Sequence, residues 1–424
     1  MHKSIKKTAL ICAGLLICTG AFADSLKLTV QDSVKRALEG NITLKQSQLN
    51  LNSLKRTKNL SWGAISPTVT ASGSWGKATE NELESLGFNI GVNLALTPSL
   101  YTSINGAVLN YEKGLLDYES AVKSIELNVR KVYYSLLFEK ENIALQNQTV
   151  ESSKKQYEST QAKYNRGAIP QIDVLSSQVT YQNNQLNLEN QKMQFVNDIA
   201  NFKQLLGIDQ SEEVELTGSL EDLISNKDIS IEGIEIKNSK VASLEKQIEI
   251  ARNNLLSTRF TAWGPTLSAS YSYAPGATSL DDFETWKDGG RFSVGASIPL
   301  DGFLPWSRGA QSIYAQQDAL KNLELQLNDA KTSQQVNIDS CLRKINQYKQ
   351  SVELRKKSVE LAQKSYNMML EAYNHGTRDL ITLQNSADKL LQAQVQLKSE
   401  IFNLAAAQLD LENEIGVEYG SLSK

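Results

Sequence analysis

The sequence predicts a mainly α-helical chain with a small β part, built as two internal structural repeats. Three observations support this prediction. The nine residues PTVTASGSW at Pro67–Trp75 return, nearly unchanged, as PTLSASYSY at Pro265–Tyr273. Long stretches place apolar residues at alternating steps of three and four, which is the period of a coiled coil. Short runs alternate apolar and polar residues, which is the period of a β-strand.

The first 23 residues are typical of an export signal. Three lysines precede a short apolar run, and Ala21–Ala23 forms an A-x-A cleavage signal. We therefore expect a signal peptide over residues 1–23 and a mature chain that begins at Asp24. A lipoprotein signal ending at Cys18 is the alternative, although Ile17 stands where such signals carry a small residue.

The composition of the mature chain excludes the commonest catalytic sites. His375 is its one histidine and Cys341 its one cysteine. These counts exclude a histidine-rich zinc site and an intrachain disulfide, and the sequence shows no Ser-His-Asp or Cys-His arrangement. The sequence also lacks a phosphate-binding glycine loop. Carboxylates are plentiful, but no pair stands out, so we expect no enzymatic activity, no cofactor and no metal site.

The charge balance argues against a nucleic-acid partner. Without the three lysines of the signal, 41 basic residues stand against 47 acidic residues, a net charge of −6. Proteins that bind nucleic acids usually carry a basic surface instead. After the signal there is no apolar run of about 18 residues, so we expect no transmembrane helix.

Two further matches extend the repeat along the chain. FNIGVNLAL at Phe88–Leu96 pairs with FSVGASIPL at Phe292–Leu300, and YNRG at Tyr164–Gly167 pairs with YNHG at Tyr373–Gly376. The offsets of the three matches are 198, 204 and 209 residues, a drift that loop insertions would produce. Repeats in the same order indicate two units of one plan.

We therefore expect a first repeat over residues 24–220 and a second over residues 221–424. Each should run through a helix, two strands, a long helix, a glycine turn and a returning helix. Between them, Gly207–Gly233 is rich in acids, Ser and Gly, and we expect little regular structure there. The expected helices are Thr29–Leu60, Tyr101–Tyr164, Ile172–Leu206, Ile234–Thr258 and Leu380–Ile415.

The helix over Tyr101–Tyr164 is long. About 64 residues at 1.5 Å each would span about 95 Å, far more than an ordinary globular helix. The two shorter helices of the first repeat have a similar summed length, so they could stack end to end beside it. Taken alone, the coiled-coil period would favour a soluble helical bundle or a fibrous coiled coil.

The strand-like runs separate apolar from small polar side chains. In the first run Val69 and Trp75 point one way, while Thr68 and Ser74 point the other. Each run has about 9–11 residues, the length of a tilted membrane-spanning strand. A soluble antiparallel sheet with one wet face is the alternative. Aromatic residues near the run ends suit an interfacial girdle: Trp62, Trp75, Trp263 and Tyr273.

Four strands cannot form a closed membrane barrel alone. In lipid every backbone donor and acceptor must be paired, so a sheet must close on itself, and known barrels begin at about eight strands. Two copies would give eight strands with a filled interior, whereas three copies leave room for a pore. We therefore predict a homotrimeric 12-stranded β-barrel with four strands per chain, continued by a long α-helical coiled-coil barrel.

On these residues the chain resembles the TolC family of outer-membrane efflux proteins. The resemblance covers the mature chain and rests on SPTVTASGSW, GPTLSASYSY, YNRGAIPQIDVLSSQ and YNHGTRDLITLQNSA. It implies a trimer in the outer membrane, embedded in its lipid, whose helical barrel extends into the periplasm. It also implies a passive exit duct of a tripartite efflux or type I secretion system. Its partners would be a periplasmic adaptor (membrane fusion protein) and an inner-membrane transporter. An envelope coiled-coil structural protein with soluble β-hairpins is the alternative.

The resemblance also implies a role for the two glycine turns. Gly167 and Gly376 follow the long helices, where glycine commonly ends a helix, and Pro170 suits the first turn of the returning helix. Helix capping is the simpler interpretation. By resemblance these turns are also the periplasmic tips that contact the adaptor. The contact residues would be Arg166, Gly167, Ala168, His375, Gly376 and Thr377.

Four further residues near the tips are gate candidates by resemblance. Asp173 matches an acidic position and Arg378 a basic one, and we hypothesise that they pair across neighbouring helices in the closed state. Thr382 and Asn385 match positions where some relatives carry carboxylates. Both are uncharged here, so we do not expect an acidic, cation-binding ring.

Overall fold

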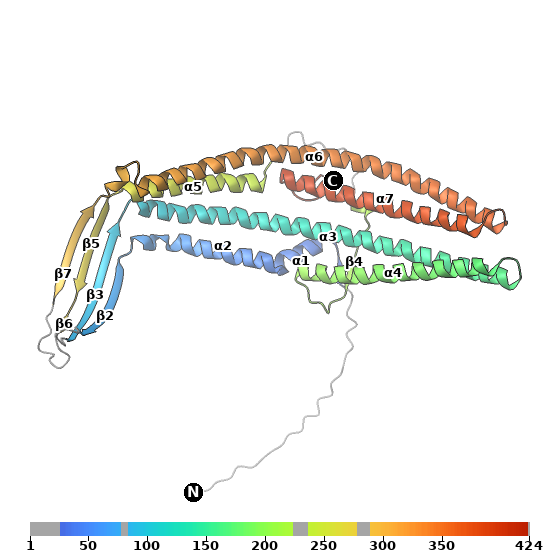
Figure 1. Ribbon diagram of the computed structural model, residues 1–424, viewed down its shortest axis with the longest axis horizontal. Helices are drawn as coiled ribbons and strands as arrows, with labels where there is room; N and C mark the ends of the chain where they lie inside the picture. Colours follow the sequence, from blue (N-terminus) through green and yellow to red (C-terminus); the bar gives the residue numbers. More distant parts are fainter. Residues whose placement is uncertain (1–25, 78–83, 224–235, 278–288, 423–424) are drawn as a thin grey trace, which may run out of the picture.

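The molecule is an elongated helical bundle with one β-sheet at its end (Figure 1). The computed structural model describes residues 26–77, 84–223, 236–277 and 289–422. The expected signal peptide lies outside the described residues. The helices of the first half are α1 (Val30–Gly40), α2 (Ile42–Leu60), α3 (Ser99–Asn165) and α4 (Gln171–Leu206). Those of the second half are α5 (Ser239–Trp263), α6 (Arg308–Asn374) and α7 (Leu380–Ile415).

The predicted stacking of short helices along a long one is confirmed. In Figure 1, α2 and α4 follow one another along α3, and α5 and α7 follow one another along α6. Each long helix has 67 residues. At 1.5 Å per residue, each is about 100 Å long.

The predicted helix over Thr29–Leu60 is broken into two at Asn41. The Asn41 side chain accepts a hydrogen bond from the Leu44 N–H at 3.2 Å and donates one to the Leu205 carbonyl at 2.8 Å. Asn41 therefore caps α2 and ties it to the end of α4. The break lies where Gly40 meets α4, since a Cβ at Gly40 would approach the Leu206 carbonyl oxygen to 2.4 Å.

The main hydrophobic core lies midway along the bundle, where the four longest helices meet. The coiled-coil positions Val129, Leu136 and Ile345 are fully buried there, as the apolar period predicts. A second, small cluster holds the helices together near the tips. It consists of Tyr373, Leu380 and Leu383, with Tyr366, Met369 and Leu370 packed against it.

The segment expected to have little regular structure has, over its described residues 207–223, only the short strand β4 (Val214–Leu216) and one 3-10 turn, which confirms that prediction, although Leu216 and Leu220 within it are buried. Strand β4 pairs in parallel with β1 (Leu26–Leu28). The Tyr133 hydroxyl lies 2.8 Å from the Leu28 carbonyl oxygen and 2.6 Å from that of Thr217. These contacts fasten β1 and the linking segment to the middle of α3.

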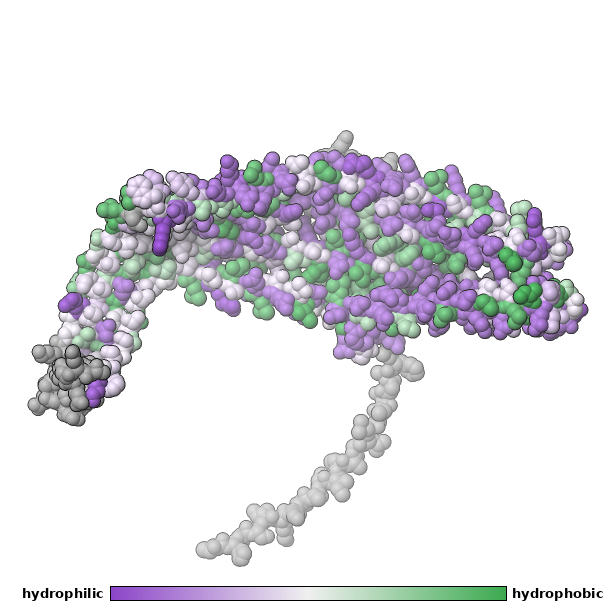
Figure 2. Space-filling view, in the orientation of Figure 1, coloured by the Kyte–Doolittle hydropathy of each residue, from purple (hydrophilic) through white to green (hydrophobic). Residues whose placement is uncertain are grey.

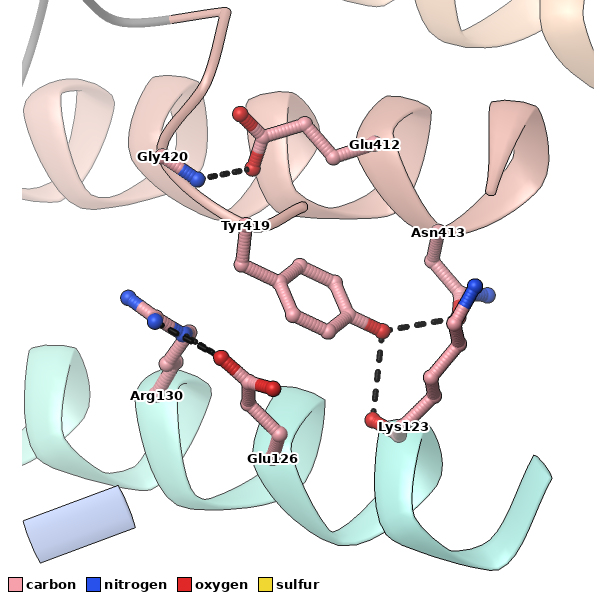
Figure 3. A network of polar contacts seen from close by, with 7 residues as sticks. All are labelled: Lys123, Glu126, Arg130, Glu412, Asn413, Tyr419 and Gly420. Carbon is pink, nitrogen blue, oxygen red and sulfur yellow. Dashed lines mark hydrogen bonds and ion pairs between the residues drawn. The ribbon is translucent and has the colours of Figure 1, made fainter. Parts of the chain in front are cut away.

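The C-terminal segment is fastened to the same region (Figure 3). The buried Glu412 carboxylate accepts hydrogen bonds from the backbone N–H groups of Gly420 at 2.8 Å and Leu422 at 2.9 Å. The Tyr419 hydroxyl lies 3.2 Å from the Lys123 carbonyl oxygen and 2.9 Å from Asn413 Oδ1. The chain after α7 thus connects α7 with α3.

The four predicted strands are confirmed. They are β2 (Thr68–Lys77), β3 (Glu84–Leu96), β5 (Thr266–Tyr273) and β7 (Gly290–Ser297). All neighbours are antiparallel in the order β2-β3-β5-β7, so the two halves of the chain share one sheet through β3 and β5. The short β6 (Gly276–Ala277) also pairs with β3. Within the described ranges, no helix combines the length and hydropathy that crossing a membrane requires.

Candidate functional site

The sheet places its large apolar side chains on one face. The cross-strand register sets Val69 opposite Val92, Val92 opposite Tyr271, and Tyr271 opposite Phe292. This face is exposed to a degree that is unusual for large apolar side chains. Val69 is 69% exposed and Phe292 is 71% exposed, and Phe88, Ile90, Leu267 and Val294 are exposed as well.

The opposite face carries small polar groups. Thr68 faces Asn93 across the first strand pair, and Ser270 lies between Asn93 and Ser293 in the next two. Several hydroxyls are satisfied within the sheet, as when Thr68 Oγ1 donates to the Asn93 carbonyl at 3.1 Å. Such a face suits contact with water and leaves space above it, because the side chains are short.

This arrangement argues against a soluble sheet. A soluble sheet would cover its apolar face with a second layer, because packing that face away from water is the main source of its stability. Among the described residues the helices meet the sheet at its end and do not cover that face (Figure 1). In Figure 2 the sheet shows few strongly hydrophilic residues, whereas the helical part is dominated by them. The exposed apolar face is therefore suited to contact with lipid.

The sheet has two open edges in one chain. β2 and β7 are its outer strands, so each has a strand neighbour on one side only among the described elements. Backbone groups on such edges form a template for pairing with another strand. The geometry fits a sheet continued by identical sheets of other copies.

Exposed apolar residues also follow the helices at coiled-coil spacing. On α6, Leu354, Leu361 and Met368 recur every seven residues and are 64–67% exposed. A seam with this period is normally packed against another helix. The corresponding seam on α4 consists of Ile172, Leu175, Val179, Leu186, Met193 and Val196.

The two helical hairpins end in the same turn. Gly167 has a φ of 74° and Gly376 a φ of 73°, the left-handed conformation that glycine adopts most readily. In the first turn the Gly167 N–H donates to the Tyr164 carbonyl, and in the second the Gly376 N–H donates to the Tyr373 carbonyl. The N–H of the residue after each glycine donates to the carbonyl five residues earlier in the helix, which is the Schellman pattern.

The structure exposes all six predicted contact residues at these turns. Arg166, Gly167 and Ala168 are exposed at one tip, and His375, Gly376 and Thr377 at the other. Two of their side chains form hydrogen bonds to the backbone of the preceding helix. Arg166 Nε donates to the Ala162 carbonyl at 3.1 Å, and Thr377 Oγ1 donates to the Ala372 carbonyl at 2.9 Å.

The gate candidates are not brought together within one chain. Asp173 is half-buried and Arg378 exposed, and no ion pair joins them among the described residues. Thr382 lies in the first turn of α7, where its backbone N–H donates to the Asp379 carboxylate at 2.7 Å. Hydrogen bonding to Thr382 lowers the pKa of Asp379, so this capping carboxylate is ionised. Asn385 is exposed one turn further along α7.

Three contacts between the hairpins were not predicted. Lys163 Nζ lies 4.1 Å from the centre of the Tyr373 ring. Gln384 Nε2 donates to Thr180 Oγ1 at 3.1 Å, and the Ser152 and Tyr366 hydroxyls lie 3.3 Å apart. A cavity of about 250 Å³ lies between the same helices, bordered largely by Ser, Thr, Asn and Gln. Of these contacts, only that of Lys163 involves a residue of a motif the sequence displays, Tyr373 of YN-x-G.

Comparison with known proteins agrees with this geometry. The family model described as outer membrane efflux protein matches residues 33–208 and 231–417. None of the curated proteins matches the sequence. Among solved structures, CusC is 12% identical over 92% of both chains, with a TM-score of 0.77.

Two further channels have similar structures. The Campylobacter jejuni outer membrane channel CmeC is 17% identical over 91% of this chain and 85% of its own, with a TM-score of 0.76. The Vibrio cholerae outer membrane protein VceC is 13% identical over 92% and 96%, with a TM-score of 0.72. At these identities the likeness shows a shared fold.

Proposed function

Because the chain belongs to the outer membrane efflux protein family, we propose that three copies form a passive exit duct from the periplasm to the outside. The family is one of efflux channels rather than enzymes, and it places the chain in the outer membrane. The helical part extends from the sheet into the periplasm.

The exposed apolar face of the sheet is the observation that carries this proposal. The face has no covering layer in the described chain. The strands β2 and β3 have 10 and 13 residues, enough to span a membrane when tilted, and β5 and β7 have 8 residues each, close to that length. In lipid the outer strands β2 and β7 must be paired. Pairing β7 of one copy with β2 of the next closes a ring, and three copies supply twelve strands around a water-filled interior.

The exposed seams of α4 and α6 support the same assembly. Three copies bring together enough helices to form a tube below the barrel, and the seams supply apolar contacts between copies. A structural protein of the envelope with soluble hairpins would use the helical seams equally well. It would leave the apolar face of the sheet unexplained.

We also propose the finer roles that the tips would play in a tripartite efflux or type I secretion system. A periplasmic adaptor would contact the turns at Gly167 and Gly376, and an inner-membrane transporter would supply the energy. The identical turns support treating residues 24–220 and 221–424 as two repeats. Asp173 and Arg378 would pair across neighbouring helices in the assembled trimer. An Arg378→Ala variant with unchanged conductance and export would disprove this last role.

The oligomer is tested first. Outer membranes are extracted in detergent and run on gels with and without heating. The proposal expects trimers that convert to monomers on heating, and cross-linked species of up to three chains. A folded, monodisperse monomer that is soluble without detergent would exclude the duct and favour the structural protein.

A further inference from the structure

The second repeat contains a loop that the first repeat lacks. In the first repeat, β3 passes into α3 through Thr97 and Pro98 alone. The offset between matching residues is 204 at Leu300, where the second strand run ends, and 209 at Arg308, where α6 begins. Five extra residues therefore lie between the strand and the helix of the second repeat. We refer to Leu300–Trp306 as the insertion loop.

The insertion loop is held firmly against the end of α5. Trp263 Nε1 donates a hydrogen bond to the Gly302 carbonyl at 2.7 Å, and its ring stacks on Phe303 with centroids 6.2 Å apart. Gly302 fits so closely that a Cβ there would approach the Ala262 carbonyl oxygen to 2.0 Å. The Ser307 hydroxyl then caps α6 by accepting from the Ala310 N–H at 3.1 Å. The loop therefore has a defined conformation.

Despite this order, the loop presents its large apolar side chains to the outside. Trp306 is 74% exposed, Leu300 73% and Phe303 61%, and Leu304 is exposed as well. In Figure 1 the loop projects at the corner where β7 meets α6. An ordered loop that exposes four large apolar groups indicates a surface that binds something apolar.

The position of the loop indicates what covers it. Phe292 and Val294 alternate along the outward face of β7, and Ile298 and Leu300 continue that spacing beyond the strand and into the loop. The loop is thus continuous with the face that the proposed barrel turns toward lipid, at the end of the barrel nearest the helices. Arg308 is exposed directly beyond it, where a cation can meet lipid phosphate.

We propose that the insertion loop is an interfacial anchor that inserts into the periplasm-facing phospholipid leaflet of the outer membrane. This inference rests on the proposed barrel. Tryptophan at the boundary between lipid and water is favourable, because its ring is amphipathic, and a short apolar segment at this depth binds as a monotopic element does. A trimer carries three such anchors, which set the height of the barrel in the bilayer.

Fluorescence quenching by lipid tests the anchor. A Cys341→Ala chain receives one new cysteine, which is labelled with an environment-sensitive dye. The sites are Leu304→Cys in the loop, Phe292→Cys on the outward face of the sheet, and Ala168→Cys at a helical tip as the control. The trimers are reconstituted in vesicles of phosphatidylethanolamine and phosphatidylglycerol, with or without lipids that carry a quencher near the headgroup.

The anchor predicts that the dye at residue 304 is quenched about three-fold more than the dye at residue 168, and that its emission shifts to the blue. Quenching at residue 292 but not at residue 304 would overturn the anchor and leave the barrel intact. A blue shift at 304 without quenching would also overturn it, because another copy of the chain would then cover the loop. Absence of quenching at residue 292 would refute the barrel itself, and the anchor with it.

Discussion

Lys163 and Tyr373 join the tips of the two helical hairpins, with the ammonium 4.1 Å from the centre of the ring. Lys163 lies in the last turn of α3, and Tyr373 lies in that of α6. Among the described residues, the contact links the hairpins near the tips together with the hydrogen bond from Gln384 to Thr180. Any widening of the tip that separates the hairpins must break it.

Removal of this contact should favour the open tip. A cation–π contact at an exposed site contributes about 0.5–1 kcal/mol. We therefore expect Lys163→Met, which retains the apolar stem, to raise the open probability of single channels by up to about five-fold. Lys154→Met, at an exposed position on the same helix, is the control. Equal open probabilities for the two variants would show that the contact does not restrain the tip.

The tip glycines should be needed for their backbone conformation and not for space. No atom lies within 4 Å of a Cβ built on Gly376, but its φ of 73° is costly for other residues. Gly376→Ala should therefore destabilise the hairpin by about 1 kcal/mol. Gly63→Ala should have little effect, because that site is equally open and its φ is not positive. The temperature at which trimers dissociate measures the difference, and equal temperatures would contradict the explanation.

Adjacent residues of β7 should respond oppositely to charge. Val294 is on the outward face and Ser293 on the inward face. A lysine facing lipid near the middle of a barrel costs about 2–4 kcal/mol, so Val294→Lys should sharply reduce trimers in the outer membrane. Ser293→Lys should assemble normally and shift the reversal potential toward anions. Normal assembly of Val294→Lys would place the outward face in water.

The stability that the segment after α7 contributes should depend on Glu412 and on pH. Burial raises the pKa of Glu412 above its ordinary value of 4.5, against the lowering effect of the Gly420 and Leu422 N–H groups. The folded chain therefore keeps the proton at pH values where the unfolded chain has lost it. This contribution to stability is complete below pH 4.5 and disappears as pH rises through the folded pKa.

Glu412→Gln removes that titration and replaces one acceptor oxygen by a donor group. We expect a loss of about 1–3 kcal/mol, because one backbone N–H loses its partner. The difference in the free energy of unfolding between the variant and the unaltered protein should become smaller as pH rises, because only the glutamate titrates. Glu418→Gln, at an exposed position, is the control. Denaturation measures this free energy at each pH. A difference between the two proteins that is the same at every pH would mean that Glu412 titrates alike in the folded and unfolded chains.

Much of the fold follows from local signals that the sequence displays. The prediction of Leu380–Ile415 coincides with α7, because Asp379 caps its start and Gly416 ends it with a φ of 82°. The strand faces follow from strict alternation, which the register confirms. In these regions the local period and the tertiary contacts agree.

Other features depend on contacts that no local period encodes. The strands β1 and β4 have three residues each, too few to alternate visibly, and the Tyr133 hydroxyl of α3 bridges the Leu28 carbonyl of β1 and the Thr217 carbonyl directly after β4. The contact of Lys163 with Tyr373 depends on how the two hairpins align sideways. The change in repeat offset revealed five extra residues near Leu300, but their outward orientation depends on how Trp263 holds the loop.

Planar-bilayer recording of the purified protein tests the central claim most directly. Trimers with a continuous water-filled interior should insert and produce discrete, reproducible current steps, and Ser293→Lys should alter the ion selectivity of those steps. Protein that is folded and trimeric but passes no current, also in the Lys163→Met variant with its loosened tip, would contradict the duct.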